Sequence, residues 1–381
     1  MKIGIDARMY GPKVGGGGLG RYVEQLITEL QSIDQENHYV LFLKKENFET
    51  CKITNSNFEK RLADIHWYTV DEQRLLPKII DSEKLDLIHF PHWNVPLFLK
   101  TPFVVTIHDL ILLDDPTSAK ATTLGPLKYT VKRIGYRTVL KNAILRSRKI
   151  ITVSHATELS ILKHFPKVDS DKIEVVYEGV TSLNDFRGLT RLREGFGEAR
   201  GTNRDYLLYI GNSYPHKNLK TLLEAFKIFS EKQPEVKLIM AGHKDLFSEA
   251  TEKFALEKNI KNVEFIHDPD DETIARLYTN AALYVFPSKI EGFGLPGLEA
   301  MSLGVPVIAA RSSSLPEIFG EAAVYFNPNS VDELANTIEK LWHDKKLQEE
   351  LKQKGFEQIK KFSWEKMARN VVNIYREIKT P

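Results

Sequence analysis

Short apolar runs alternate with amphipathic stretches along most of this chain, and that alternation predicts its fold class. The predicted strands of the first half are Lys2–Asp6, Tyr39–Leu43, Ile65–Val70, Leu85–Phe90, Phe103–Ile107, Lys149–Val153 and Ile173–Tyr177. Those of the second half are Tyr206–Ile210, Lys237–Ala241, Val263–Ile266, Leu283–Phe286, Val305–Ala309 and Ala323–Phe326. Helical patterns such as Arg21–Ser32 and Leu219–Lys232 separate them. Continuous apolar strands separated by helices are typical of parallel sheets covered on both faces, so we predict an α/β protein.

The polar stretch Thr181–Asp205 separates the two series of strands and lacks a long apolar run. A length of 381 residues also favours two domains. We therefore predict a doubly wound domain over residues 1–185, a second one over residues 200–362, and a last helix near Trp364–Ile378. In such domains ligands bind beyond the carboxyl ends of the strands, in a cleft where the halves meet.

Composition excludes several classes of protein. Hydrophobic residues make up 42% and charged residues 27%, as in an ordinary globular protein, and a net charge of +2 gives no reason to expect nucleic acid as a partner. The single cysteine, Cys51, cannot form an intramolecular disulfide, and no Cys/His cluster suggests zinc. The chain lacks a signal-peptide layout and any apolar run near the ~20 residues that span a bilayer. We expect a cytoplasmic protein.

The segment Glu291–Glu299 carries the clearest functional pattern. It follows the predicted strand Leu283–Phe286 and contains glycines and Pro296 before an apolar helix. Proline suits a helix start, glycine lets the backbone approach a ligand, and the amides of a helix start favour an anion such as phosphate. The two glutamates would project toward one ligand from the loop and from the helix. The alternative is a surface loop with two solvated glutamates, but the surrounding pattern favours a ligand site.

Two other loops follow the first strand of each half. Gly15–Gly20 precedes a helix and is similar to phosphate-cradling turns, with a flexible loop over the cleft as the alternative. It is not the dinucleotide fingerprint, because the loop from Asp6 to Gly15 is too long. Lys217 lies after Gly211 near a helix start and can neutralise a diphosphate as a point charge. The alternative there is an exposed lysine in a loop.

Histidines follow two of the predicted strands. His108 stands at the carboxyl end of Phe103–Ile107, where it would point at the cleft, unless a backbone carbonyl holds it. His89 and His92 could also rim the cleft. A three-histidine metal site is conceivable, but the spacing is not a known ligand spacing, and we expect no metal.

A basic stretch lies between Pro116 and Thr157, which contains no Asp or Glu. Lys128, Lys132, Arg133 and Arg137 alternate there with apolar residues at roughly helical spacing. A basic amphipathic helix can lie on an anionic membrane surface, and a solvated helix face is the alternative.

Taken together, these motifs resemble family 4 glycosyltransferases, which are retaining enzymes of the GT-B architecture that use sugar nucleotides. The resemblance covers essentially the whole length. The motifs that stand in the family's order are Ile5–Arg8, Gly17–Tyr22, His108-Asp109, Thr152–Ser154, Pro215–Asn218, Pro287-Ser288, Glu291–Glu299 and Leu315–Glu317. The N-terminal motifs are similar to those of bacterial mannosyl- and rhamnosyltransferases of surface-polysaccharide assembly. The resemblance implies two Rossmann-like domains facing across a cleft, with a C-terminal helix over residues 363–381 that packs back on the first domain.

The resemblance also implies roles for the matching residues. Glu291 would bind hydroxyls of the donor sugar, and His108 would reach that sugar near the reacting carbon. The donor-binding set that the resemblance implies is Gly17, Gly18, Gly211, Lys217, His267, Phe293, Gly294, Leu295 and Glu299. Asn212 departs from the family, because many relatives carry a basic residue there. The second charge of the diphosphate clamp is therefore left unassigned.

The function that follows is transfer of a hexose, with retention and without a metal or other cofactor. On the resemblance alone we expect mannose from GDP-mannose, with a UDP-sugar as the other donor, and a saccharide or lipid-linked acceptor in cell-surface glycan synthesis. An enzyme with a small soluble acceptor such as a sugar phosphate, a nucleotide-binding dehydrogenase and a binding protein without activity are the alternatives. The basic stretch favours a lipid-linked acceptor at the inner face of a membrane.

Overall fold

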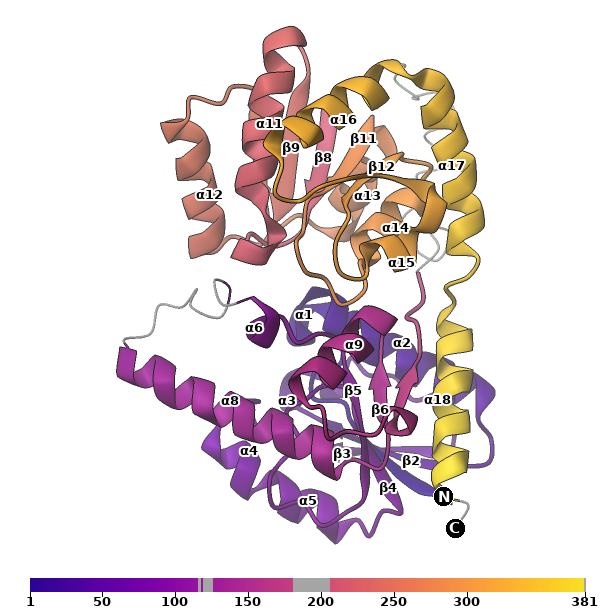
Figure 1. Ribbon diagram of the computed structural model, residues 1–381. Helices are drawn as coiled ribbons and strands as arrows, with labels where there is room; N and C mark the ends of the chain where they lie inside the picture. Colours follow the sequence, from indigo (N-terminus) through magenta and orange to yellow (C-terminus); the bar gives the residue numbers. More distant parts are fainter. Residues whose placement is uncertain (116–117, 119–125, 181–205, 380–381) are drawn as a thin grey trace. The chain divides into compact units, whose positions relative to one another are not determined.

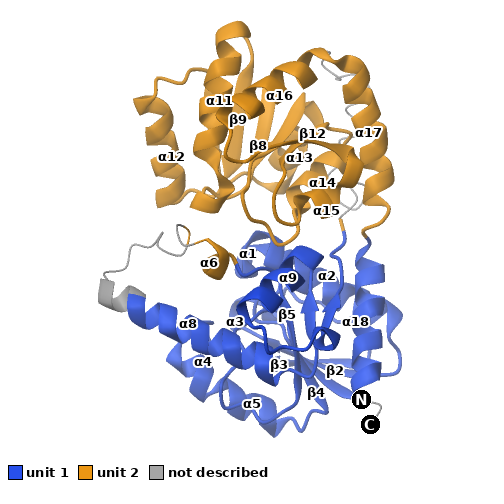
Figure 2. Cartoon of the chain, viewed as in Figure 1, with its two compact units in different colours: residues 1–110, 122–179, 363–381 blue, residues 111–121, 180–362 orange. Residues whose placement is uncertain are grey.

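The computed structural model describes residues 1–115, 118, 126–180 and 206–379, which fall into two compact units (Figure 1, Figure 2). The first unit comprises residues 1–110, 122–179 and 363–381, and the second comprises residues 111–121 and 180–362. The predicted connection between residues 185 and 200 lies outside the described residues.

The first unit is built on a parallel sheet in the order β3-β2-β1-β4-β5-β6-β7. Its strands are β1 Lys2–Asp6, β2 His38–Leu43, β3 Phe58–Leu62, β4 Leu87–Phe90, β5 Phe103–Ile107, β6 Ile150–Thr152 and β7 Ile173–Val175. Ile3 of β1 pairs with Tyr39 on one side and with Leu87 on the other. Every residue of β4 and β5 is buried, which is why these strands appear in the sequence as continuous apolar runs.

The second unit contains another parallel sheet, in the order β10-β9-β8-β11-β12-β13. Its strands are β8 Tyr206–Ile210, β9 Lys237–Gly242, β10 Val263–His267, β11 Leu283–Phe286, β12 Val307–Ala310 and β13 Ala323–Phe326. In both units the first strand lies between the second and the fourth, so the chain reverses direction across the sheet at that point. This is the doubly wound order, and it confirms the prediction of two Rossmann-like halves.

Helices flank the first sheet. They are α1 Pro12–Gly15, α2 Gly17–Ile33, α3 Lys45–Phe48, α4 Val70–Arg74, α5 Leu76–Ser82, α8 Pro126–Arg146, α9 His155–His164 and α18 Trp364–Lys379, with a short turn η1 at Ser170–Lys172. The last helix, α18, packs against α2 (Figure 1). Met367, Val371 and Tyr375 are buried on one side of it, and Tyr375 Oη lies 2.6 Å from His89 Nδ1. The C-terminal helix thus belongs to the first unit.

The helices of the second unit are α6 Ile111–Asp114, α11 Leu219–Lys232, α12 Leu246–Glu257, α13 Asp271–Asn280, α14 Leu295–Ser302, α15 Leu315–Phe319, α16 Val331–His343 and α17 Lys345–Ile359, with short turns η3 Pro215–Lys217 and η4 Gly320–Ala322. Helix α11 packs against α16, and α14 packs against α17. Leu222, Phe226 and Phe229 bury the apolar side of α11, as its spacing predicted.

The predicted strand Ile65–Val70 is wrong. The third strand is Phe58–Leu62, which lies at the edge of its sheet and leaves Glu59, Lys60 and Arg61 partly exposed. An edge strand with charged side chains gives no apolar run, so the pattern does not mark it. Residues 65–69 form a loop instead, and Thr69 caps α4 by accepting a hydrogen bond from the Glu72 backbone N–H.

The second correction concerns the glycine-rich segment. The helix predicted from Arg21 begins at Gly17, so Gly17 and Gly18 belong to its first turn and not to a loop. Gly20 accounts for the tight packing there, because a Cβ on it would lie 2.2 Å from the carbonyl oxygen of Gly11.

Candidate functional site

Two predicted residues meet at the point in the second sheet where the strand order reverses. The loops after β8 and β11 begin at neighbouring strand ends, which is where open α/β sheets bind ligands. Lys217 ends the turn η3 after β8, and Glu291 lies in the loop after β11. Lys217 Nζ is 2.6 Å from Glu291 Oε1, and the two side chains are only 14% and 10% exposed. The structure therefore joins a cation and a carboxylate at the site that the sequence assigned to a donor.

The Glu291 loop is held from two sides. Ser313 Oγ and Ser314 Oγ, which follow β12, donate to the Glu291 carbonyl oxygen over 2.8 and 3.0 Å. On the other side the Lys289 N–H donates to the carbonyl oxygen of His216, next to Lys217, over 2.8 Å. These contacts fix the position of the loop. The sequence does not predict the role of the two serines, because nothing in their local pattern links them to the Glu291 loop.

Helix α14 begins beside this loop. Gly294 precedes it with φ 113°, a conformation that glycine adopts readily, and Pro296 lies in its first turn. A Cβ on Gly297 would lie 2.2 Å from the Phe319 ring, so this glycine lets α14 approach α15. Glu299, one turn further on, lies 3.3 Å from Tyr278 Oη. Phe293, Gly294 and Leu295 thus stand at a helix start, whose dipole favours an anion.

A hollow lies at the carboxyl ends of β8, β9 and β10. Its lining includes Gly211, Gly242, His243, Ser248 and His267. Gly242 must remain a glycine because a Cβ there would lie 2.0 Å from the carbonyl oxygen of Gly211. His267 Nε2 lies 2.7 Å from Glu252 Oε1 at the rim. The structure thus brings Gly211 and His267 to one hollow.

In the first unit, His108 follows β5 and both its ring nitrogens are engaged. Nδ1 lies 3.0 Å from Glu178 Oε1, and Nε2 lies 2.9 Å from the carbonyl oxygen of Pro91. Both partners accept, so both nitrogens donate and the ring is an imidazolium. Burial acts to lower the pKa of His108, but the hydrogen bond and the charge of Glu178 outweigh it and the pKa is raised. The sequence analysis left open that a backbone carbonyl holds His108, and the Pro91 carbonyl does so at Nε2.

The three histidines considered as metal ligands each bond to other side chains. His89 lies between Tyr375 Oη and Thr106 Oγ1, His92 bonds to Asn94, and His108 bonds to Glu178. Across residues 1–115, 126–180 and 206–379, no group of three or more His, Cys, Asp or Glu side chains is arranged to hold a metal ion.

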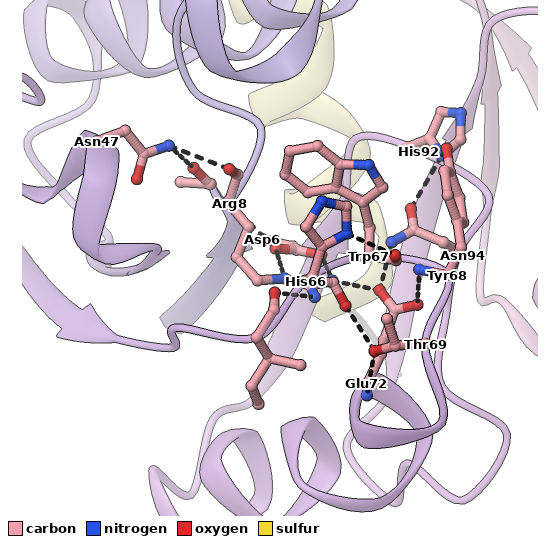
Figure 3. Close-up of polar contacts among 12 residues, drawn as sticks. Asp6, Arg8, Asn47, His66, Trp67, Tyr68, Thr69, Glu72, His92 and Asn94 are labelled. Atoms are coloured by element: carbon pink, nitrogen blue, oxygen red, sulfur yellow. Dashed lines mark hydrogen bonds and ion pairs between the residues drawn. The ribbon is translucent and has the colours of Figure 1, made fainter.

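A buried ion-pair cluster lies where the order of the first sheet reverses, and the sequence did not predict it (Figure 3). Arg8, which follows β1, is 1% exposed and makes a two-pronged contact with Asp6, at 2.8 and 2.7 Å. Its Nη2 also lies 2.6 Å from Glu72 Oε1. Asn47 donates to the carbonyl oxygens of residues 7, 8 and 10, which fixes the loop that carries Arg8.

The other predicted residues of the first unit lie on its surface. Gly17 and Gly18 are exposed, and a Cβ on Gly17 would meet nothing within 4 Å. Lys132, Arg133 and Arg137 are exposed on α8, whereas the side chain of Lys128 lies outside the described part of the chain. None of the helices that the structure describes is long and apolar enough to pass through a bilayer.

Comparison with known proteins extends over nearly the whole chain. The family described as "Glycosyltransferase Family 4" matches residues 16–182, and the family "Glycosyl transferases group 1" matches residues 192–358. O-antigen chain mannosyltransferase B of Escherichia coli is 30% identical over 94% of this chain and 96% of its own length. O-antigen chain mannosyltransferase RfbU of Salmonella typhimurium is 26% identical over 82% and 84%. HepE of Anabaena, solved in complex with UDP and glucose, is 19% identical and superposes with a TM-score of 0.72 over 99% of this chain and 100% of its own.

Proposed function

Because this chain belongs to glycosyltransferase family 4, we propose that it transfers mannose from GDP-mannose to a saccharide or lipid-linked acceptor in the synthesis of a cell-surface glycan. The family makes the protein a glycosyltransferase and decides against a dehydrogenase. The names of the two mannosyltransferase relatives support the sugar and the glycan. The observation that carries a donor site is the Lys217–Glu291 ion pair at the reversal point of the second sheet.

The donor would lie along the carboxyl edge of this sheet. Lys217 and the amides of Phe293, Gly294 and Leu295 would bind the diphosphate, since a cation and a helix start both favour it. Glu291 would then exchange part of its contact with Lys217 for sugar hydroxyls. The base would enter the hollow beside His267, and Glu299 would bind the ribose.

The reaction that we propose is transfer on one face of the sugar, with retention. The bond from the anomeric carbon to the diphosphate breaks ahead of attack by the acceptor hydroxyl, and the departing phosphate takes the hydroxyl proton. Charge then grows on the diphosphate, where Lys217 and the helix-start amides would stabilise it without a metal.

Lys289 is our candidate for the second charge that Asn212 does not supply. Its backbone is bonded beside Lys217, its side chain is exposed, and its Nζ has no polar partner among the described residues. Lys289→Met would then weaken GDP binding several-fold.

A lipid-linked acceptor would bring the enzyme to the inner face of a membrane. On α8 the basic side chains Lys132, Arg133 and Arg137 and the apolar Val131 and Ile134 are all exposed, the last two at 63% and 61%. Charges and apolar groups together favour an anionic bilayer surface.

Co-sedimentation with vesicles containing anionic lipid tests this step. Reversing Lys132, Arg133 and Arg137 to Glu should remove binding, whereas the same reversal at the exposed Lys253, Lys261 and Lys346 of the second unit should not. A wild-type protein that does not bind vesicles would refute the membrane step alone.

A thermal-shift panel of GDP, GDP-mannose, UDP, UDP-glucose and NADH tests the proposed function. A ligand at 100 times its Kd stabilises the native state by about 2.7 kcal/mol. GDP and GDP-mannose should raise the Tm, and NADH should not. If only UDP and UDP-glucose raise the Tm, the protein is still a glycosyltransferase but its donor is a UDP-sugar and not GDP-mannose. If only NADH raises the Tm, the proposal is overturned.

A further inference from the structure

The buried Asp6–Arg8–Glu72 cluster of the first unit continues outward to a histidine (Figure 3). Glu72 is 1% exposed and accepts from three donors: Arg8 Nη2 at 2.6 Å, Asn94 Nδ2 at 2.6 Å and the Tyr68 N–H at 2.8 Å. Buried ion pairs add little net stability, because desolvation offsets their attraction. Their effect here is to fix what they touch, namely Tyr68 and Asn94.

The orientation of Asn94 determines which nitrogen of His92 carries a proton. A carboxylate only accepts, so the Asn94 amide group must point its nitrogen at Glu72 and its oxygen at His92. That oxygen lies 2.9 Å from His92 Nδ1, which therefore donates. Burial, followed by the charge of His108, lowers the pKa of His92 to about 3, so the ring is neutral. His92 Nε2 is consequently a lone-pair acceptor, and it has no hydrogen-bond partner in the described part of the chain.

Two aromatic rings, those of Tyr68 and Trp93, lie near the His92 ring. Tyr68 and Trp93 stack with centroids 5.0 Å apart and an angle of 15° between their planes, and His92 lies 5.9 and 5.1 Å from them. Tyr136 of α8 meets Trp93 edge-on at 4.7 Å. Tyr68 is 49% exposed although it is a large ring, and His92 and Trp93 are partly exposed, so this group reaches the surface and is not part of a core. Its backbone φ of 62° is unusual for tyrosine, and the bond from its N–H to Glu72 holds it there.

We propose that the Tyr68–His92–Trp93 group is a binding subsite for a pyranose ring of the acceptor, with His92 Nε2 accepting a sugar hydroxyl. This inference rests on the proposed transfer reaction and names the class of acceptor. A pyranose has an apolar C–H face, which fits the ring of an exposed aromatic residue, and hydroxyls at its edge, which fit a fixed acceptor. A bare hydrocarbon chain would use the rings but leave the oriented His92 without a partner.

Fluorine NMR of protein labelled with 5-fluorotryptophan tests the subsite. The chain has four tryptophans, and Trp342 and Trp364 lie outside the group. Methyl α-D-mannopyranoside, and the methyl glycosides of glucose, galactose and rhamnose, should shift the Trp93 resonance, which Trp93→Phe identifies. The signals of Trp342 and Trp364 should stay in place. Loss of the hydroxyl contact in His92→Ala should weaken the mannoside about tenfold, and His92→Gln should restore part of the affinity.

His38→Ala is the matched control, since His38 starts β2 at the amino ends of the strands and its side chain is exposed. It should bind the mannoside as the wild type does. No shift of Trp93 with any pyranoside, an unchanged affinity in His92→Ala, or a shift with GMP alone would overturn the subsite. GDP stabilisation of the same samples reports on the donor site separately. If pyranosides bind and no sugar nucleotide does, the proposed function fails; if only sugar nucleotides bind, the subsite fails.

Discussion

The Lys217–Glu291 pair gives a prediction that separates a donor site from an ordinary ion pair. We compare Lys217→Met with Glu291→Gln and measure affinity for GDP, which has the diphosphate but no sugar. Of these two residues, only Lys217 contacts GDP under the proposed function. Lys217→Met should therefore lose affinity, whereas Glu291→Gln should keep it or gain slightly, because Lys217 is released from its partner.

The structure sets the size of both effects. A hydrogen bond to a charged group contributes about 1.5–3 kcal/mol, so Lys217→Met should weaken GDP by roughly 10- to 150-fold. The two side chains are 14% and 10% exposed, between a surface pair worth about 0–1 kcal/mol and a buried pair whose disruption costs about 3–5 kcal/mol. Both variants should therefore be destabilised by about 2–3 kcal/mol and still fold.

Isothermal titration calorimetry measures the affinity, and thermal unfolding without ligand measures the stability. If the pair were structural only, both variants would lose stability and neither would change its affinity for GDP. Equal losses of GDP affinity in the two variants would also refute the reasoning, since they would place Glu291 on the diphosphate.

Other predictions concern packing and pH. Gly297→Ala should destabilise the second unit by about 1–3 kcal/mol, because its Cβ would lie 2.2 Å from the Phe319 ring. In Gly135→Ala, in the exposed part of α8, the new Cβ meets nothing within 4 Å, and this variant should be more stable by up to about 1 kcal/mol. Thermal unfolding of both variants measures the two effects. In Glu178→Gln the partner that raises the pKa of His108 against burial is lost. A raised folded-state pKa stabilises the fold below the ordinary value of 6.5, and that contribution is lost as pH rises through the folded pKa. In denaturant titrations the difference in unfolding free energy between wild type and Glu178→Gln should therefore be largest below pH 6.5 and become smaller above it. A difference that grows with pH would contradict the role of Glu178 in raising the pKa of His108.

The strands that the sequence predicts well are those covered on both faces. Phe103–Ile107 and Leu283–Phe286 are buried at every residue, so their apolar runs are unbroken. The sequence does not predict the strand Phe58–Leu62, because its charged side chains reach water at the sheet edge and break the apolar pattern. The run of aromatic and β-branched residues that begins at Ile65 fits a strand pattern better, although it forms no strand.

The candidate site is predictable where one segment carries it and not where distant segments meet. Glu291 and Lys217 each stand out from their own neighbours, but their contact joins residues 74 apart. Arg8 bonds to Glu72 across 64 residues, and no local pattern marks that glutamate. Glu72 in turn orients Asn94, and Asn94 orients His92. Because these contacts join segments far apart in the sequence, the sequence does not predict the proposed acceptor subsite.

The most direct test of the central claim is transfer from GDP-mannose to octyl α-D-mannopyranoside, with the product's anomeric configuration read by NMR. The account predicts an α-linked product from the wild type and none from Glu291→Ala. Transfer by Glu291→Ala at the wild-type rate, or a β-linked product, would contradict it.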